Sequence, residues 1–523
     1  MLRRAFLITA LVGLVLPTLS FGYDTLWVRK YPVGFGQDVA IDPSNNICVA
    51  GTGMFPTSGL DYVTIKYYPN GDTAWVRKYN SGGTQDDHGV AVGVDGSGNV
   101  YVTGYSYIGA HGLDNVITTR KYSPAGTLLW SADYGPAGEL KAGPRDIFVD
   151  AVGNAYVAGA SDRGVATGFD AIVIKYLPSG DTAWVRRYAG PRDIDDMLNA
   201  ITVDDFGNVY AAGSTGYLTN SSYLTLAYDA LGNLLWSRAY QGVPPPEFGD
   251  NIADGIDHDG KGNIFVFGTV GSTPYSKTAL IKYLAGGDMA WVRWYPGPGG
   301  PPYAMSALHS VRVDKNGWVY AGASKQVAAV GPYDYTTLRY DQSGDTTWVR
   351  LYDGGGDDRL TGLAPDIYGN ICVTGRSYLP AGGWDWITIK YDRYGDEMWR
   401  HKYSGPGPVE YDDDVPNAIA TDNFGYVCVT GYSSNLTVSQ DITTIKYYPD
   451  CCQGATGNVD GDPDDVVDIS DLSAMVDFLF SGGSLSSCAA ENNVDGLGSV
   501  DISDLQMLID FLFSGAILPS CPV

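Results

Sequence analysis

The chain has 523 residues and a formal net charge of −26, and 44% of its residues are hydrophobic. This hydrophobic share is typical of a folded protein and excludes a mostly disordered chain. The negative charge disfavours nucleic acid and anionic lipid as partners, because both would be repelled. Tyrosine (38 residues) and glycine (68 residues) are abundant, which favours short strands joined by tight turns.

Residues 1–22 have the pattern of a signal peptide. Two arginines precede an apolar stretch at 5–19, and the small residues Ser20 and Gly22 stand at the −3 and −1 positions of a cleavage site before Tyr23. No later segment approaches the ~20 apolar residues that a membrane-spanning helix needs. We therefore expect bacterial-type export and a secreted protein, extracellular or associated with the cell surface, with no membrane span.

Two motifs each recur eight times between residues 23 and 449. The first, of the type DGSGNVYVTG, recurs every 52 to 56 residues and begins at Asp42, Asp95, Asp150, Asp204, Asp259, Asp314, Asp366 and Asp422. The second, of the type GDTAWVRKY, carries Trp27, Trp75, Trp130, Trp184, Trp236, Trp291, Trp348 and Trp399. Self-similarity at this period is typical of propellers and solenoids.

Each repeat has the pattern of four short strands, which in the second repeat are GVAVGVD, NVYVTG, VITTRKY and TLLWSADY. Residues 23–31 form a lone fourth strand, and the last repeat has only its first three strands, ending at Pro449. Pairing of these two fragments would close a ring and remove its free edges. The sequence therefore predicts a mainly β fold over residues 23–449, an eight-bladed β-propeller of four-stranded blades closed by its N-terminal strand.

Lysine and arginine recur nearly once per blade on the third and fourth strands. They are Lys66, Lys175, Lys282, Arg339, Lys390 and Lys446 on third strands, and Arg29, Arg77, Arg186, Arg293 and Arg350 on fourth strands. We interpret a feature repeated in this way as architectural, through cross-strand pairing on the outer strands. Cys48, Cys372 and Cys428 lie within strand patterns and are expected to be buried packing residues.

Acidic residues gather in the loops that lead into the first strands, and radial repetition would arrange them in a ring. They are Asp86, Asp87, Asp193, Asp195, Asp196, Asp250, Asp357, Asp358 and Asp412 to Asp414. Three interpretations stay open: solvated turn residues, a mouth that binds cations or sugar, or a carboxylate pair for glycoside cleavage, which needs two groups about 5 to 9.5 Å apart. The sixth loop lacks an acid and contains His309. No residue is assigned as catalytic, since no nucleophile elbow or HExxH motif is present.

Residues 450–523 contain two acidic loops, each followed by an amphipathic helix: VVDISDLSAMVDFLFSGG and SVDISDLQMLIDFLFSGA. EF-hand spacing places oxygen ligands at loop positions 1, 3, 5, 7, 9 and 12. The first loop offers Asp460, Asp462, Asp464, the Val466 carbonyl, Asp468 and Asp471. The second offers Asn493, Asp495, the Ser499 carbonyl, Asp501 and Asp504, with Leu497 unable to ligate at position 5. We expect Ca²⁺ in the first loop and a second, weaker Ca²⁺ site in the other.

The helices are expected to bury Leu472, Met475, Leu479, Leu505, Leu508 and Leu512. Phe478, Phe480, Phe511 and Phe513 cannot all be buried in so small a unit, so some apolar surface is expected to be exposed. Four cysteines, Cys451, Cys452, Cys488 and Cys521, flank the acidic motifs. Export permits disulfides there, but the three possible pairings cannot be told apart from the sequence.

Two family resemblances follow from these motifs. GNVYVTGYS, GNAYVAGAS and GNICVTGRS resemble the SBBP-type β-propeller repeat, with the NHL-type repeat a close second. The paired loop–helix units, with Asp at position 12, resemble a type I dockerin over residues 457–516. The second resemblance implies calcium-dependent docking to a cohesin-like partner through positions 10 and 11, which are Ile469 with Ser470 and Ile502 with Ser503.

The favoured interpretation is an exported, non-catalytic binding or scaffold protein. Its propeller would present a surface to a polysaccharide or a surface protein, and its dockerin-like domain at 450–523 would dock to the cohesin-type partner. The alternative is a secreted carbohydrate-active enzyme, a glycoside hydrolase or lyase, with catalytic acids in the acidic propeller loops. A third possibility is that the C-terminal domain only caps or anchors the propeller.

Overall fold

The computed structural model describes residues 25–449, except for short loop segments, and parts of the C-terminal region. The loop segments left out are 83, 109–113, 136–140, 163–167, 191–194, 217–220, 243–250, 272–275, 297–304, 307–310, 327–330, 380–382, 408–412 and 436–438. Beyond Pro449 it describes 457, 459, 467–481, 494 and 500–518. The predicted signal peptide and Cys451, Cys452, Cys488 and Cys521 lie outside these residues.

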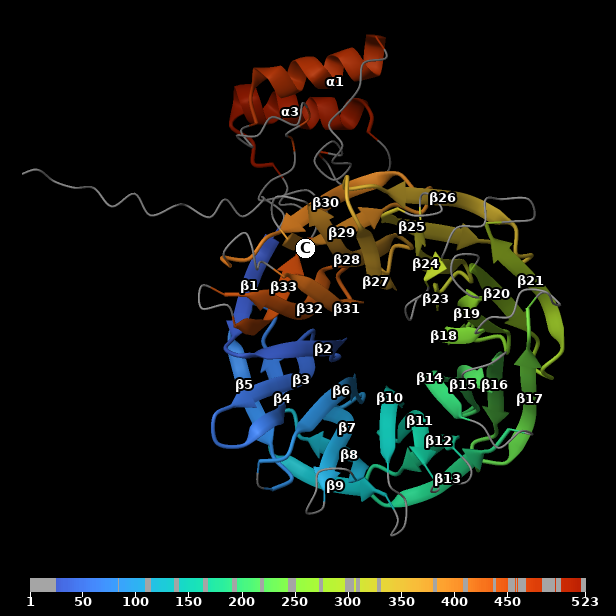
Figure 1. The fold of residues 1–523 in the computed structure, drawn as a ribbon. Helices are drawn as coiled ribbons and strands as arrows, with labels where there is room; N and C mark the ends of the chain where they lie inside the picture. Colours follow the sequence, from blue (N-terminus) through green and yellow to red (C-terminus); the bar gives the residue numbers. More distant parts are fainter. Residues whose placement is uncertain are drawn as a thin grey trace, which may run out of the picture.

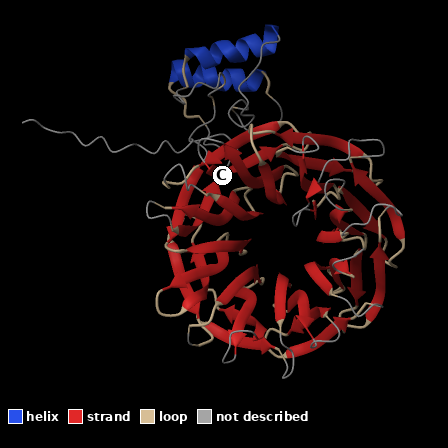
Figure 2. Cartoon of the chain, in the orientation of Figure 1, coloured by secondary structure: helices blue, strands red, loops and turns tan. Residues whose placement is uncertain are grey.

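The strands form eight antiparallel sheets arranged as blades around a ring (Figures 1 and 2). The first four blades are β2 Gly34–Ile41, β3 Ile47–Phe55, β4 Gly59–Tyr67, β5 Thr73–Tyr79; β6 Asp87–Val94, β7 Val100–Ile108, β8 Asp114–Tyr122, β9 Leu128–Tyr134; β10 Ala142–Val149, β11 Ala155–Asp162, β12 Phe169–Tyr176, β13 Thr182–Tyr188; and β14 Asp196–Val203, β15 Val209–Thr215, β16 Ser222–Tyr228, β17 Leu234–Tyr240. In each blade the chain runs from the innermost strand to the outermost.

The next three blades follow the same order. They are β18 Ile252–His258, β19 Ile264–Val270, β20 Lys277–Tyr283, β21 Met289–Tyr295; β22 Met305–Ser306 with β23 Val311–Val313, then β24 Val319–Gln326, β25 Tyr333–Tyr340, β26 Thr346–Tyr352; and β27 Asp358–Pro365, β28 Ile371–Leu379, β29 Gly383–Tyr391, β30 Glu397–Tyr403. The sixth blade departs from the pattern, because its innermost strand is divided into β22 and β23, which both pair with β24.

The eighth blade joins the two ends of the propeller region, as predicted. It consists of β31 Val415–Thr421, β32 Val427–Ser434, β33 Gln440–Tyr447 and the N-terminal strand β1 Thr25–Tyr31. Strand β1 pairs antiparallel with β33, with Val28 opposite Ile445 and Tyr31 opposite Ile442. The predicted eight blades and their closure by the N-terminal strand are therefore confirmed.

The repeated Asp-x-x-Gly-Asn motif builds the turn between the first and second strands of each blade. In the second blade, Asp95 accepts hydrogen bonds from the backbone N–H groups of Ser97 and Asn99, and the Asn99 amide bonds to its second oxygen. Gly98 has φ +76°, a conformation that glycine adopts without steric cost. Asn45 takes this position in the first blade with φ +60°, because asparagine tolerates the left-handed region better than most residues.

The hydrophobic core lies between neighbouring blades. Trp27, Cys428 and Ile442 of the eighth blade pack in one cluster with Val39 and Ile47 of the first. Val, Ile, Ala and Tyr side chains fill the other blade-to-blade contacts in the same way. Cys48, Cys372 and Cys428 are fully buried free thiols, which confirms them as packing residues.

Two helices follow the propeller, α1 Ile469–Ser481 and α3 Ile502–Ser514. They contact each other and share a small core that contains Met475, Leu505 and Leu508, with Leu472, Leu479 and Leu512 packed against it. The predicted apolar side of these helices is therefore confirmed. Neither helix has the length and hydrophobicity needed to cross a bilayer.

Candidate functional site

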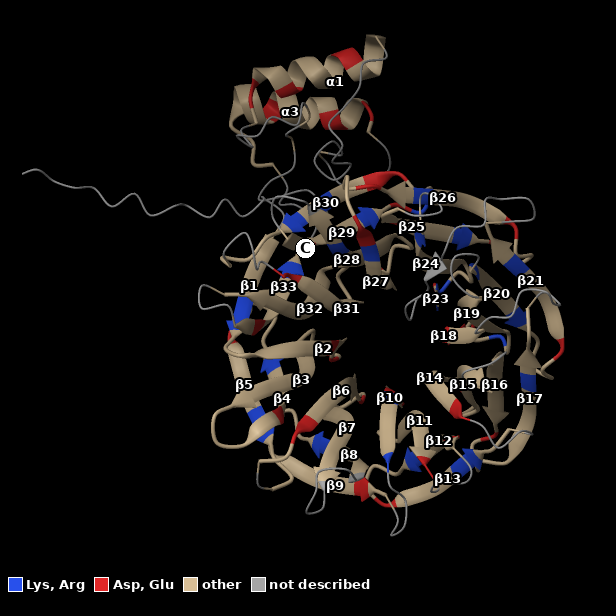
Figure 3. Ribbon diagram, in the orientation of Figure 1, with Lys and Arg blue, Asp and Glu red and all other residues tan. Residues whose placement is uncertain are grey.

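The recurrent tryptophans and arginines of the fourth strands connect most blades to the next. Trp75 donates its indole N–H to the carbonyl of Pro124 at 3.0 Å, and Arg77 donates from Nε to the carbonyl of Gly126 at 2.6 Å. Both acceptors lie in the turn between β8 and β9 of the following blade. Arginines 29, 186, 238, 293 and 350 bond in the same way to the matching turn. Figure 3 shows the basic residues spaced around the ring.

The recurrent lysines of the third strands are buried and bond to the turn aspartates. Lys66 contacts Asp42 at 2.7 Å and Lys390 contacts Asp366 at 2.9 Å, and all four side chains are nearly inaccessible to solvent. Lys121 with Asp95 and Lys446 with Asp422 repeat the pair. The predicted architectural role of these lysines is therefore confirmed. The predicted cross-strand pairing is not what they form: their partners are aspartates of the turns and backbone carbonyls of the next blade.

The acidic loops bind backbone N–H groups. The first aspartate of each pair bridges to the preceding blade: Asp86 accepts from Leu60, Asp195 from Phe169 and Asp357 from Tyr333. The second closes its own loop: Asp87 accepts from Ser81, Asp196 from Gly190, Asp358 from Gly354 and Asp414 from Gly405. Burial raises the pKa of Asp87, Asp196 and Asp358 above the ordinary carboxyl value. The described loop acids therefore connect neighbouring blades and close their own loops through hydrogen bonds.

A cavity with a volume of about 600 Å³ lies in the central channel. Innermost strands line it, and each unbroken one carries a β-bulge that leaves one residue out of the ladder. Six of the bulged residues face the cavity: Gln37, Val90, Arg145, Asp254, Thr361 and Asn417. A bulge re-aims a side chain, and here it turns mostly polar groups toward the axis of the ring.

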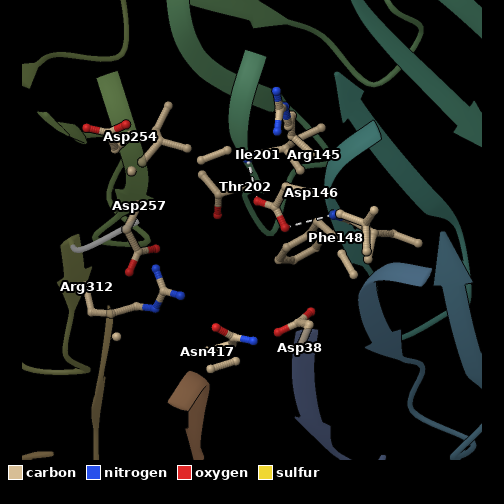
Figure 4. Close-up of a pocket in the computed structure, with 18 of the residues that line it drawn as sticks. Asp38, Arg145, Asp146, Phe148, Ile201, Thr202, Asp254, Asp257, Arg312 and Asn417 are labelled. Carbon is tan, nitrogen blue, oxygen red and sulfur yellow. Dashed lines mark hydrogen bonds between the residues drawn. The ribbon is translucent and has the colours of Figure 1, made fainter. Parts of the chain in front are cut away.

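Three channel aspartates join neighbouring blades (Figure 4). Asp38 accepts from Val39 and from Val92 of the next blade, both at 2.8 Å. Asp146 bonds likewise to Ile201, and Asp257 to Val313. Removal from bulk water raises the pKa of Asp38 to about 7 and that of Asp146 to about 6.

Asp254 and Arg312 are two further charged residues that line this cavity. Burial raises the pKa of Asp254 well above its ordinary value. Figure 4 shows Arg312 next to Asp257. The positive charge of Arg312 opposes the rise in the pKa of Asp257, Asp146 and Asp38. The channel therefore holds a carboxyl group whose pKa is raised by burial, and a guanidinium group whose charge acts on the aspartates that join the blades.

Four of the described C-terminal acids lie at the starts of the two helices. Asp501 accepts from the backbone N–H of Ser503 at 2.8 Å, and Asp504 accepts from the backbone N–H of Asp501 at 2.7 Å, which together make a capping box. Asp468 and Asp471 are arranged in the same way at the start of α1. Asp471 and Asp504 are fully buried. All four acids therefore accept hydrogen bonds at the start of a helix.

Several predicted site residues lie outside the described residues. They are Asp460, Asp462, Asp464, Val466, Asn493, Asp495 and Ser499 of the calcium loops, and Asp193, Asp250, Asp412 and His309 of the propeller loops. The predicted partner-binding residues are described: Ile469, Ser470, Ile502 and Ser503 all lie on the first turn of a helix and are exposed.

No family model matches the chain, and no curated protein matches it. Among solved structures it is similar to Sqt1 from Chaetomium thermophilum, at 8% identity and a TM-score of 0.48, over 81% of this chain and 97% of that one. It is also similar to an ulvan lyase of a polysaccharide lyase family (12%, 0.40, over 81% and 96%) and to the WD40 domain of SCAP from fission yeast (10%, 0.41, over 80% and 94%). Likenesses this low carry no conclusion about activity.

The channel residues were missed by sequence reasoning. Asp38 and Asp146 stand where other first strands carry Ala91, Ala200 and Gly255, so this departure from the repeat was visible in the sequence. The position of each β-bulge was not, because a bulge depends on how the neighbouring strand pairs. Without the bulge, alternation alone does not say which of these side chains face the channel.

Proposed function

We propose that this chain is an exported binding and assembly protein, in which the propeller presents a ligand surface and the C-terminal helix pair docks to a cohesin-type partner. The observation that carries the proposal is a duplicated exposed surface on α1 and α3. Ile469 is 63% exposed and Ile502 is 66% exposed, while Phe480 and Phe513 are each 66% exposed. Each residue of the second helix stands 33 positions after its counterpart in the first.

Large apolar side chains exposed at matching positions of two packed helices support a role in partner binding. The same helices bury their other apolar residues against each other, so their exposed isoleucine and phenylalanine are available to another molecule. Duplication supports the resemblance to a type I dockerin, where either helix can face the cohesin.

The proposal includes calcium binding by the two acidic loops of the C-terminal region. The first loop would hold Ca²⁺ with Asp460, Asp462, Asp464, Val466, Asp468 and Asp471, and the second would hold it more weakly. Asp471 and Asp504 are carboxylates at the last ligand position of each loop and are buried among hydrophobic residues with no lysine or arginine after residue 450. A bound cation would offset the cost of burying this negative charge.

Binding of the full chain to an immobilised type I cohesin domain tests this proposal. Two variants each disable one helix face, Ile469→Asp with Ser470→Asp and Ile502→Asp with Ser503→Asp, and a third combines them. Because the faces are duplicates, each single-face variant should keep its affinity within about threefold. The combined variant should lose at least 100-fold, and EGTA should abolish binding of the wild type.

A matched control is Phe206→Asp, since Phe206 is 79% exposed on the propeller and should leave binding unchanged. Equal binding by the combined variant, or binding that persists in EGTA, would refute the docking role. Failure of the wild type to bind any cohesin tested in calcium would do the same.

A further inference from the structure

A cluster of three carboxylates lies where the sixth blade meets the seventh. Asp334 is at the start of β25, Asp353 follows β26, and Asp358 begins β27. One carboxylate oxygen from each residue lies within 4.8 Å of those from the other two. Asp334 and Asp358 are buried, and Asp353 is exposed.

Among the described residues, Lys325 is the basic side chain whose charge opposes the rise in the pKa of Asp334. None of the three carboxylates forms a salt bridge among the pairs at or below 4.0 Å that join described residues. Lys325 stands opposite Asp334 on the neighbouring strand. Its ammonium group lies over the Tyr295 ring, 5.8 Å from the ring centroid.

Asp334 has no hydrogen-bond partner for its buried oxygen Oδ1, although the side chain is only 8% exposed. Asp353 and Asp358, by contrast, accept backbone N–H bonds from Gly355 and Gly354. Burial and the two neighbouring carboxylates raise the pKa of Asp334 to about 6. A buried carboxylate with an oxygen that has no donor, within 4.8 Å of two other carboxylates, is stabilised by either a proton or a cation.

In the first blade, hydrogen-bond donors surround the aspartate that is equivalent to Asp334. Asp61 occupies the position of Asp334 and accepts from the Asn80 amide at 2.9 Å and from the Ser58 hydroxyl at 2.6 Å. Asn80 follows the outermost strand, as Asp353 does in the sixth blade. In the seventh blade the equivalent Asp385 contacts Lys402 at 2.7 Å. The sixth blade has a carboxylate in place of the donor.

We propose that Asp334, Asp353 and Asp358 bind a Ca²⁺ ion at the junction of the sixth and seventh blades. Calcium–oxygen bonds are about 2.3 to 2.6 Å long, so two ligands of one ion lie up to ~5 Å apart. The spacing of 4.8 Å or less between the three oxygens meets this limit. Water would complete the coordination on the exposed side, next to Asp353. The site is independent of the C-terminal loops.

Calcium titration of the full chain by calorimetry, compared with the variant Asp353→Asn, tests this proposal. Asp353→Asn recreates the donor that Asn80 supplies in the first blade, so the fold should be kept. We expect the variant to bind one Ca²⁺ ion fewer per chain than the wild type. The control Asp345→Asn removes another exposed charge from the same blade and should leave the number of ions unchanged.

The reverse change gives a second measurement. Asn80→Asp would build the same three carboxylates from Asp61, Asp87 and the side chain introduced at position 80, and should add one Ca²⁺ ion per chain. An unchanged number of ions in Asp353→Asn, with the far-ultraviolet spectrum of the wild type, would overturn the proposal. Because both variants leave residues 450–523 intact, the outcome does not depend on whether the C-terminal loops bind calcium.

Discussion

At the scale of single residues, the charged side chains of this propeller are parts of its framework. Lys390 and Asp366 are both 0% exposed and lie 2.9 Å apart. Asp366 also accepts bonds from the Asn370 amide and from backbone N–H groups of its turn. A buried pair of this kind needs both partners, because an isolated buried charge is far more costly than the pair.

Replacing Lys390 by methionine leaves Asp366 buried without a cation. We expect the free energy of unfolding to fall by about 3 to 5 kcal/mol, measured by urea denaturation. The control is Arg400→Met, which breaks the exposed contact between Arg400 and Glu397 and should cost about 1 kcal/mol or less. Equal losses in the two variants would contradict the role given to the buried pair.

At the scale of elements, the outermost strands hold the blades in sequence. Trp130 of β9 bonds to the Pro178 carbonyl at 3.1 Å, but Ala132 stands where the other strands of this type carry arginine. In the last such strand, β30, His401 takes the arginine position and stacks on Tyr447. The matching turn would join the third and fourth strands of the eighth blade, but these strands, β33 and β1, come from opposite ends of the propeller region.

Strand β9 therefore lacks an arginine bond to the next blade, and a substitution could add it. Ala132→Arg should bond to the Gly180 carbonyl and stack on Trp130, as Arg77 does with Gly126 and Trp75. We expect a gain in stability of about 0.5 to 1.5 kcal/mol, read from chemical denaturation. Leu129→Arg, at the exposed residue that the β-bulge of β9 leaves out of the ladder, adds the same charge and should give no gain. A gain equal in both variants would assign the effect to net charge.

At the scale of the whole molecule, the ring depends on strand β1. Trp27 of β1 packs in the core between the eighth and first blades, and six Cα partners join β1 to β33. Without β1 the backbone groups of β33 would form an open edge.

Deletion of residues 23–31 should therefore open the ring. We expect a loss of at least about 3 kcal/mol, the usual cost of removing one large buried aromatic side chain, together with oligomers seen by size-exclusion chromatography. A synthetic peptide of residues 23–33 should restore the monomer and its stability by adding back the strand, whereas a scrambled peptide should not. A deletion variant that stays monomeric with unchanged stability would show that closure by β1 is dispensable.

The blade number, the four-strand repeat and the ring closure could be predicted because they depend on local patterns repeated eight times. Alternation, Gly and Asp turns and the offset between residues 23–31 and Pro449 are all visible along the chain. The apolar side of the C-terminal helices followed from their periodicity in the same way.

The groups that come together across blades could not be predicted. Asp334, Asp353 and Asp358 are separated by 19 and 5 residues in the chain, and their oxygens meet because two neighbouring sheets place them at one junction. The channel side chains depend on bulges in strands that pair over long distances. Local pattern sets each strand, whereas the packing of one blade on the next sets which charges share a site.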